Sequence, residues 1–279
     1  MGTYSEKLIS VEFKLASNSD EVVRLDGYRC EVNIQNAGGR SQSSIDMVIY
    51  NVNQDLSQLI VGQGFSQFTT KSTISLLAGE QDNQIQVYQG TVVDAYVDYN
   101  KMPDVPMRIQ SNSKYYYQVK PAAPNSYRGA AKVQDIIKSL AESCGYAFVN
   151  HGVDKTLNDM YLVGSVINQM MDCADAADIG MTIHNGNVEI SNKGGILTDI
   201  VPEVSPETGM VGYPTVTNQG VVVSMLFNPQ LRRQGRVLIK SDNKAADGVL
   251  TIVNLTHNIS SKIPGGVWMT TIRAIKYAG

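Results

Sequence analysis

Two carboxylates, Asp94 and Asp98, come nearest in this sequence to a spacing that could support catalysis. Residues four apart in a β-strand share a face, and paired carboxylates divide acid and base roles when a pocket separates their pKa values. A hydrolase that uses this pair is therefore one interpretation. The same face of the expected strand also carries Val92 and Tyr96, and nothing nearby indicates a desolvated cleft. An exposed strand surface is the favoured interpretation.

The histidines do not form a metal-binding pattern. His151, His184 and His257 lie far apart in the sequence, and none belongs to a His-x-x-x-His or Glu-x-x-His element. We therefore expect no metal and no cofactor. His257 in a strand and His184 beside a turn are expected to be hydrogen-bonded structural residues.

Aromatic residues offer a second kind of chemistry. The run Tyr115 to Tyr117, or the single tryptophan Trp268, could stack against sugars, so a carbohydrate-binding β-module is an alternative. High strand propensity explains the tyrosines equally well. The alternating strand around Trp268 makes it an anchor of a core or of a subunit interface. Arg232 and Arg233 are expected to be solvated or interface charges.

Composition excludes several classes of protein. The 279 residues include 23 Lys and Arg against 26 Asp and Glu, which gives a net charge of −3 and leaves no basic excess for static binding of nucleic acid. The chain is long enough to fold without disulfides.

The odd set Cys30, Cys144 and Cys173 predicts reduced thiols and synthesis in a cytoplasm. Residues 1–20 contain no signal peptide, and no run reaches the ~20 apolar residues of a membrane span, so we expect no membrane insertion.

The first hundred residues alternate with a period of two, which predicts an antiparallel β-domain. A short helix is expected inside it, from Asp55 to Ile60. The residues expected on the buried face are Ile9, Val11, Phe13, Leu15, Ile45, Met47, Ile49, Val93, Ala95, Val97 and Tyr99.

The middle of the chain changes to a helical period. A strand pair over 107–110 and 115–119 leads into the proline-rich linker 120–125, where each proline restricts the backbone. A helix follows with Val133, Ile136, Ile137, Leu140 and Ala141 on one stripe and Gly145 at its end, and a second helix is expected over 165–177. Asn185-Gly186 predicts a hairpin between 181–184 and 187–190.

The C-terminal part returns to strands, expected over 221–225, 236–240, 249–259 and 267–274. The sequence therefore predicts a mainly β chain with an α+β insert, in which two β-barrel-like domains flank a small α/β domain. The expected domains are residues 1–120, 121–195 and 196–279, and the last domain is allowed to share strands from 105–120.

Several segments occur in an order and spacing that resemble the baseplate hub proteins of contractile-tailed phages, the Mu-type hub family. The likeness covers the chain from about residue 85 to its end, and more loosely the first β-region. The segments are Val87–Val92, Met102–Arg108, Tyr116–Pro121, Pro206–Thr215, Ser224–Pro229, Gly235–Ser241 and Leu255–Thr271.

This resemblance implies a structural protein and no enzyme. Members of the family form a homotrimeric ring whose paired β-barrels give a pseudo-sixfold surface, which adapts the hexameric tail tube to the trimeric central spike. The implied partners are the tail tube protein, the spike protein and other baseplate proteins, with DNA only as transiting cargo. The implied location is the virion baseplate, after synthesis in the bacterial host. No appended enzymatic segment is expected, so the spike is expected to be a separate chain.

Two strands and one loop are the expected contact elements of the ring. They are the strand around Val92 to Tyr99, the strand from Val221 to Phe227, and the loop after the next-to-last strand, although a tight hairpin alone would also explain that loop. The interface residues predicted on them are Asp94, Tyr96, Asp98, Leu226, Phe227, Pro264, Gly265 and Gly266.

Overall fold

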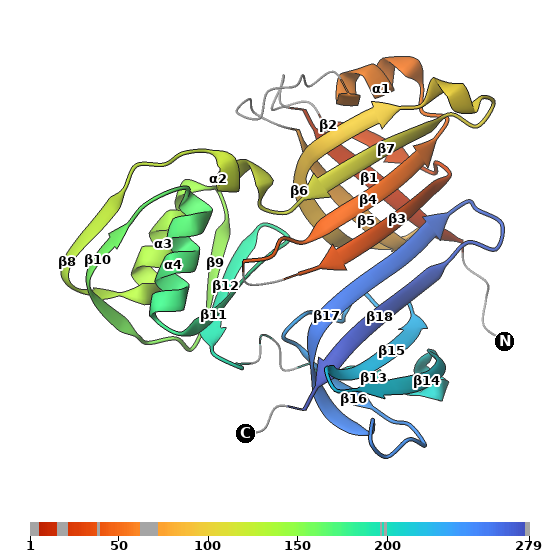
Figure 1. Ribbon diagram of the computed structural model, residues 1–279. Helices are drawn as coiled ribbons and strands as arrows, with labels where there is room; N and C mark the ends of the chain where they lie inside the picture. Colours follow the sequence, from red (N-terminus) through yellow and green to blue (C-terminus); the bar gives the residue numbers. More distant parts are fainter. Residues whose placement is uncertain are drawn as a thin grey trace.

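The chain folds into a large antiparallel sheet with an α/β unit at its side (Figure 1). The structure is a computed structural model and describes residues 6–15, 22–37, 40–61, 72–195, 197 and 200–276. The mainly β class with an α/β insert is thus confirmed. None of the described helices is long and apolar enough to cross a membrane.

The N-terminal strands bury the alternating residues that the sequence marks. Ile9, Val11 and Phe13 are almost fully buried, and so are Ile45 and Met47. The expected helix is present as α1 (Gln54–Val61). The strands are β1 (Lys7–Lys14), β2 (Val22–Asp26), β3 (Cys30–Asn36), β4 (Ser44–Tyr50), β5 (Thr73–Glu80), β6 (Asn83–Val97) and β7 (Pro106–Asn112).

The C-terminal strands continue the same sheet, because β17 pairs with β3 in antiparallel register. The strand order is β14-β15-β18-β17-β3-β4-β7-β6-β5-β1-β2, and the short η2 (Pro206–Thr208) precedes β14. The C-terminal strands are β13 (Glu203–Val204), β14 (Met210–Thr217), β15 (Gly220–Leu226), β16 (Arg236–Ile239), β17 (Gly248–Ser261) and β18 (Trp268–Ile275).

The expectation of two barrels is met only in part. The described strands outside the insert form one 13-stranded sheet with β14 and β2 at the ends of its main path, and neither half closes into a hydrogen-bonded barrel within these residues. The N-terminal half does curl, so that the Ser261 hydroxyl at the end of β17 donates to the Lys7 carbonyl at the start of β1 at 3.5 Å. The 14 residues of β17 join the two halves, because this one strand contributes Ile259 to the first core and Leu255 to the last.

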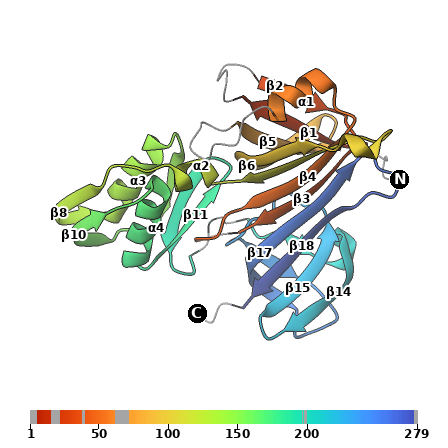
Figure 2. The same cartoon turned by 45° about the horizontal axis from the view of Figure 1, so that its top comes forward.

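The insert packs two helices between a small sheet and a β-ribbon (Figure 2). The stripe from Val133 to Ala141 is buried, and Gly145, with φ +70°, follows the helix end as expected. Asn185 and Gly186 both have positive φ, as a two-residue hairpin turn requires. The elements are α2 (Tyr115–Val119), β8 (Asn125–Lys132), α3 (Val133–Ser143), β9 (Ala147–His151), β10 (Thr156–Leu162), α4 (Val166–Ala176), β11 (Ile179–His184) and β12 (Asn187–Asn192).

Two local predictions are wrong. Residues 115–119 form the helix α2 and not a strand, because Tyr117 packs edge-on against Tyr146 with ring centroids 5.6 Å apart. Tyr99 lies in the 3-10 helix η1 (Tyr99–Lys101), outside β6, because the Asp98 side chain accepts a hydrogen bond from the Asn100 amide and ends the strand at Val97.

Buried apolar side chains form three clusters, one in the N-terminal strands, one in the insert and one in the C-terminal strands. This distribution follows the order of the three predicted domains. The limits at residues 120 and 195 stay a prediction.

Candidate interaction surface

One face of the sheet carries a continuous row of side chains across β15, β18, β17, β3, β4, β7 and β6. Residues directly opposite one another in neighbouring antiparallel strands point to the same side of the sheet. Strand register therefore defines the row, which consists of Leu226, Met269, Asn258, Asn33, Asp46, Gln110 and Asp94. We call the side of the sheet that carries this row the polar face.

The middle of the polar face is a hydrogen-bonded layer of amides and hydroxyls. The Asn33 amide donates to the Asn258 side chain, and the Gln110 amide donates to Asp46 at 2.9 Å. In the adjoining row, the hydroxyls of Ser224 and Thr271 lie 3.1 Å apart. These groups largely satisfy one another, so the surface is hydrophilic without depending on charge.

Charges on the polar face are few and mixed in sign. The next row places Glu31 and Arg108 on either side of Val48, and Arg273 lies opposite Val222. Together with Asp46 and Asp94, these residues are the charged side chains that the strand register places on the polar face between β15 and β6. Among the described residues of these seven strands, no stripe of lysine or arginine is present that would hold phosphates by counterion release.

A groove of about 650 Å³ lies where the loop between β17 and β18 meets the polar face. Tyr96 and Arg108 line it from the sheet, and Gly265 and Gly266 line it from the loop. Gly265 has φ +67°, and a Cβ at Gly266 would collide with the Ser260 hydroxyl. The local structure of the loop therefore explains the two glycines, as expected for a tight hairpin.

The structure brings most of the predicted interface residues to this face. Asp94 and Leu226 stand at opposite ends of one row, and Tyr96 lines the groove with Gly265 and Gly266. Pro264 is exposed in the same loop. Their role as an interface stays a prediction.

Two of the predicted residues lie elsewhere. Asp98 is outside the strand and caps η1. Phe227 is half-buried, and its ring packs edge-on against His257 and Trp268 at centroid distances of 5.1 and 5.2 Å. Phe227 is thus committed to contacts within its own chain, whereas its neighbour Leu226 is exposed.

Strand β14 carries exposed apolar side chains that the sequence reasoning did not single out. Val211, Tyr213 and Val216 all lie on the surface, and Tyr213 is 82% exposed. The register between β14 and β15 shifts from Val211 to Thr215, so Tyr213 stands in a bulge. The sequence signal was Gly212-Tyr213-Pro214, because glycine and proline inside a strand mark a bulge or an edge.

Residues 8–265 match the family model described as Baseplate hub gp41. The chain belongs to the baseplate hub gp41 family. The resemblance seen in the sequence is confirmed at this level, and the hub is a structural component of a phage tail baseplate. The prediction that it is no enzyme is confirmed by the structural character of this family.

Solved tail proteins share the fold of the hub. The tail protein from Neisseria meningitidis MC58 has a TM-score of 0.68 at 10% identity, and the match covers 98% of this chain and 97% of that one. The 43 kDa tail protein of prophage MuSo2 from Shewanella oneidensis also has a TM-score of 0.68, at 9% identity, with 97% and 98% covered.

A secretion protein has a more distant likeness. The Escherichia coli c3393 protein, a component of the type VI secretion system described as structurally similar to the T4 bacteriophage tail proteins gp27 and gp5, has a TM-score of 0.58 at 9% identity. The match covers 100% of this chain and 75% of that one. At such identities the likeness concerns the fold alone. No curated protein sequence matches the hub.

The residues invoked for the alternative functions do not assemble in the hub. Tyr115, Tyr116 and Tyr117 are half-buried on α2, where no flat stacking platform forms. Trp268 packs beside Phe227 on the first core, which confirms it as a core anchor. Within the described residues, no group of three or more His, Cys, Asp or Glu side chains is arranged to hold a metal ion.

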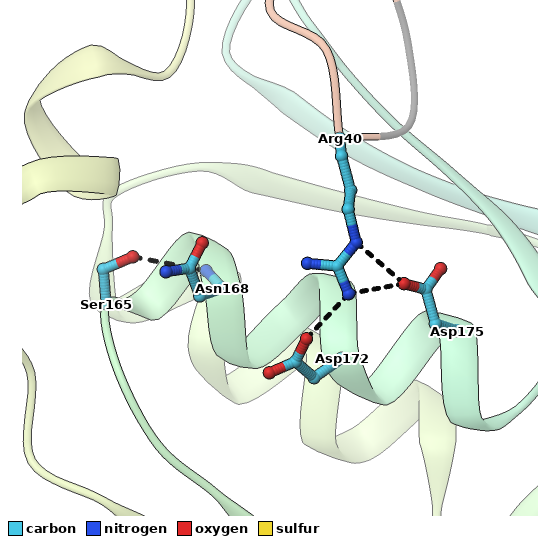
Figure 3. A network of polar contacts seen from close by, with 5 residues as sticks. All are labelled: Arg40, Ser165, Asn168, Asp172 and Asp175. Atoms are coloured by element: carbon cyan, nitrogen blue, oxygen red, sulfur yellow. Dashed lines mark hydrogen bonds and ion pairs between the residues drawn. The ribbon is translucent and has the colours of Figure 1, made fainter.

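The insert of the hub is attached to the sheet by polar contacts. Arg40, in the connection between β3 and β4, binds Asp172 at 2.8 Å and reaches Asp175 with Nε at 3.0 Å (Figure 3). Both carboxylates belong to α4, whose first turn is capped by the Ser165 hydroxyl, which accepts from the Asn168 amide at 3.3 Å. One arginine thus links a sheet connection to a helix of the insert.

A second, more buried contact joins the insert to the C-terminal part. Glu189 of β12 accepts from Arg232 and lies 3.0 Å from His151 Nε2. The pKa of both His184 and His257 is lowered to about 4, chiefly by burial, and the charge of Arg232 contributes to the lowering at His184. His257 also bonds Thr270 at 2.8 Å, as expected for a structural histidine. Arg232 serves an internal contact between parts of one chain.

Proposed function

We propose that three copies of the hub form a ring that adapts the hexameric tail tube to the trimeric central spike. The observation that carries this proposal is the pattern along the polar face, which is hydrophilic in its middle strands and exposes apolar side chains at both ends. Exposed apolar patches mark interaction sites. A face of this kind suits a ring in which the ends meet neighbouring copies and the middle faces an open channel.

The polar middle is the proposed wall of a DNA conduit. Its amides and hydroxyls already bond one another, and its few charges are of both signs. Such a wall offers no cluster of cations that would retain the phosphates of passing DNA. The DNA is therefore cargo and not a bound ligand.

The remaining partners follow from the position of a hub in a tail. The proposed ring contacts the tail tube protein on one side and the spike protein on the other, with other baseplate proteins around it. Residues 1–120 and 196–279 would supply the paired tube domains, with 121–195 as the appended insert. The described similarity of the E. coli c3393 protein to gp27 and gp5 supports this arrangement by fold. Synthesis takes place in the cytoplasm of the bacterial host.

Mass measurement of the full chain in solution, combined with electron micrographs, tests the proposal. We expect a trimer in equilibrium with monomer and a threefold ring with an open bore. A species that stays monomeric at every concentration, or a closed assembly without a bore, would contradict it. A monomer that binds glycan would favour the carbohydrate-binding alternative.

A further inference from the structure

We propose that neighbouring copies of the hub meet along a tyrosine seam, in which Tyr213 of one copy packs against Tyr96 and Tyr99 of the next. The inference rests on the proposed ring, since it names the residues that join its copies. The occupant of each exposed end is thus a second copy of this chain.

The direction of the strands at the two ends of the polar face permits such a seam. From β14 to β6 the sheet has eight strands, and every neighbouring pair along this path is antiparallel. With an even number of alternating strands, β14 and β6 run in opposite directions. A head-to-tail arrangement of copies therefore places these two strands antiparallel across each contact, and the alternation continues around the ring.

Strand β6 has a margin at the required place where no second described strand pairs with it. Its pairing with β5 ends at Thr91, the Val92 amide still donates to the Ser72 carbonyl at 2.9 Å, and from Asp94 to Val97 β7 is the strand that pairs with it among the described residues. This margin holds Tyr96, and η1 places Tyr99 directly after it. At the opposite end of the face, β14 pairs only with β15 among the described strands. Unpaired strand margins are sites where another chain associates.

Exposed tyrosines are concentrated at these two margins. The described part of the chain has four, and three of them are Tyr96 at 48%, Tyr99 at 50% and Tyr213 at 82% exposure. The fourth, Tyr161 at 66%, is on β10 of the insert. Tyrosine is enriched among the residues that dominate binding energy at interfaces, because it buries a large ring at low entropic cost and keeps a polar tip.

Side chains carry this contact better than backbone pairing does. The bulge at Gly212 to Pro214 interrupts the outer margin of β14, and Pro214 has no N–H to donate. A bulge also redirects a side chain, here that of Tyr213. The contact is heterologous, because one margin meets a different margin of the next copy, and it closes as a ring when the rotation between copies is one third of a turn.

Alanine substitutions measure the contribution of the seam. Tyr213→Ala and Tyr96→Ala, made separately in the full chain, are each expected to raise the dissociation constant of the trimer at least about tenfold. Tyr161→Ala is the matched control, since it removes an exposed tyrosine from the insert and is expected to leave the trimer unchanged. The unfolding midpoint of each variant shows that the fold is retained.

Cross-linking identifies the pairing itself. The native cysteines Cys30, Cys144 and Cys173 are buried, so a short bis-maleimide is expected to report introduced thiols. The double variant Tyr213→Cys with Tyr96→Cys is expected to give covalent dimers and trimers. Tyr213→Cys alone, and Tyr161→Cys with Tyr96→Cys, are expected to stay monomeric on a denaturing gel.

The possible results separate the seam from the ring. A wild-type trimer that survives both alanine changes, with no cross-link in the double variant, overturns the seam and leaves the ring standing. Cross-linking by Tyr213→Cys alone indicates a two-fold contact and also overturns it. Absence of any wild-type trimer overturns the ring and the seam together.

Discussion

The two β-regions of the hub are joined by backbone hydrogen bonds, whereas the insert is attached mainly through side chains. Strand β17 pairs with β3 on one side and with β18 on the other, so the N-terminal and C-terminal halves form one sheet. The insert has its own buried cluster and contacts the rest through Arg40, Glu189 and similar polar groups. Polar interfaces between domains allow relative motion. We therefore infer two levels of rigidity in one chain.

Shortening a buried side chain in each core should produce the largest effect and show directly whether the sheet and the insert differ in rigidity. Ile34 in β3 and Met170 in α4 are both fully buried, the first in the N-terminal cluster and the second in the insert. Ile34→Ala and Met170→Ala are each expected to cost about 2–5 kcal/mol of local stability, because each leaves a cavity. Hydrogen exchange should show the effect of Ile34→Ala throughout the sheet and that of Met170→Ala mainly in the insert.

The two variants serve as controls for each other, since both remove buried apolar volume. If Met170→Ala accelerates exchange in β3 and β17 as much as in α3 and α4, the insert is part of one cooperative unit and the contrast between the regions is wrong.

The second-largest effect is expected from acid, which should lower the stability of the fold through two histidines at the contact between the regions. His184 of the insert and His257 of β17 have pKa values of about 4, against an ordinary value of 6.5. Between these values the unfolded chain binds protons that the folded chain does not, so stability falls as the pH drops from about 6.5 to about 4. At about 1.4 kcal/mol per pKa unit, the loss is expected to be at most about 3 to 4 kcal/mol for each histidine.

Urea unfolding measures how steeply the free energy of unfolding falls with pH across this range. In the double variant His184→Gln with His257→Gln, this dependence on pH should be weaker, whatever the stability of the variant at pH 7. An unchanged slope would show that other groups cause the acid sensitivity.

Removal of Arg40 should have the smallest effect. Its side chain is 60% exposed, and exposed ion pairs contribute less than about 1 kcal/mol. Arg40→Ala is expected to increase hydrogen exchange in α4 slightly at low salt, and to make no difference at high salt, where screening already weakens the contact. Lys132→Ala, which removes an exposed ion pair with Asp154 inside the insert, is the control and should not change α4 in this way.

Much of the fold follows from local patterns. Period-two alternation located β1 and β4, the helical stripe located α3, and Asn185-Gly186 located the hairpin, because in each case burial and local propensity agree. The strand predicted for residues 115–119 is wrong because three tyrosines favour a strand by propensity, while the packing of Tyr117 on Tyr146 favours a helix. The sharing of β17 between two cores depends on contacts between distant segments, which no local pattern contains.

The candidate surface was predictable in part. Alternation places Asp94 and Tyr96 on one face of a strand, but only the register of neighbouring strands shows that Leu226 lies at the far end of the same row. Phe227 differs from Leu226 by one residue and therefore turns to the opposite side, where it packs against Trp268. Tyr213 was missed because its role depends on β14 being the outermost strand.

The length of β17 also has a mechanical consequence. Since the same strand holds Leu255 in one core and Ile259 in the other, the two cores cannot twist against each other unless the ladders to β3 and β18 break. The inclination between the halves is thus fixed within each monomer before any assembly. If three copies close a circle, its diameter is a property encoded by this strand, and an applied load must be absorbed at the joints between copies or by the insert.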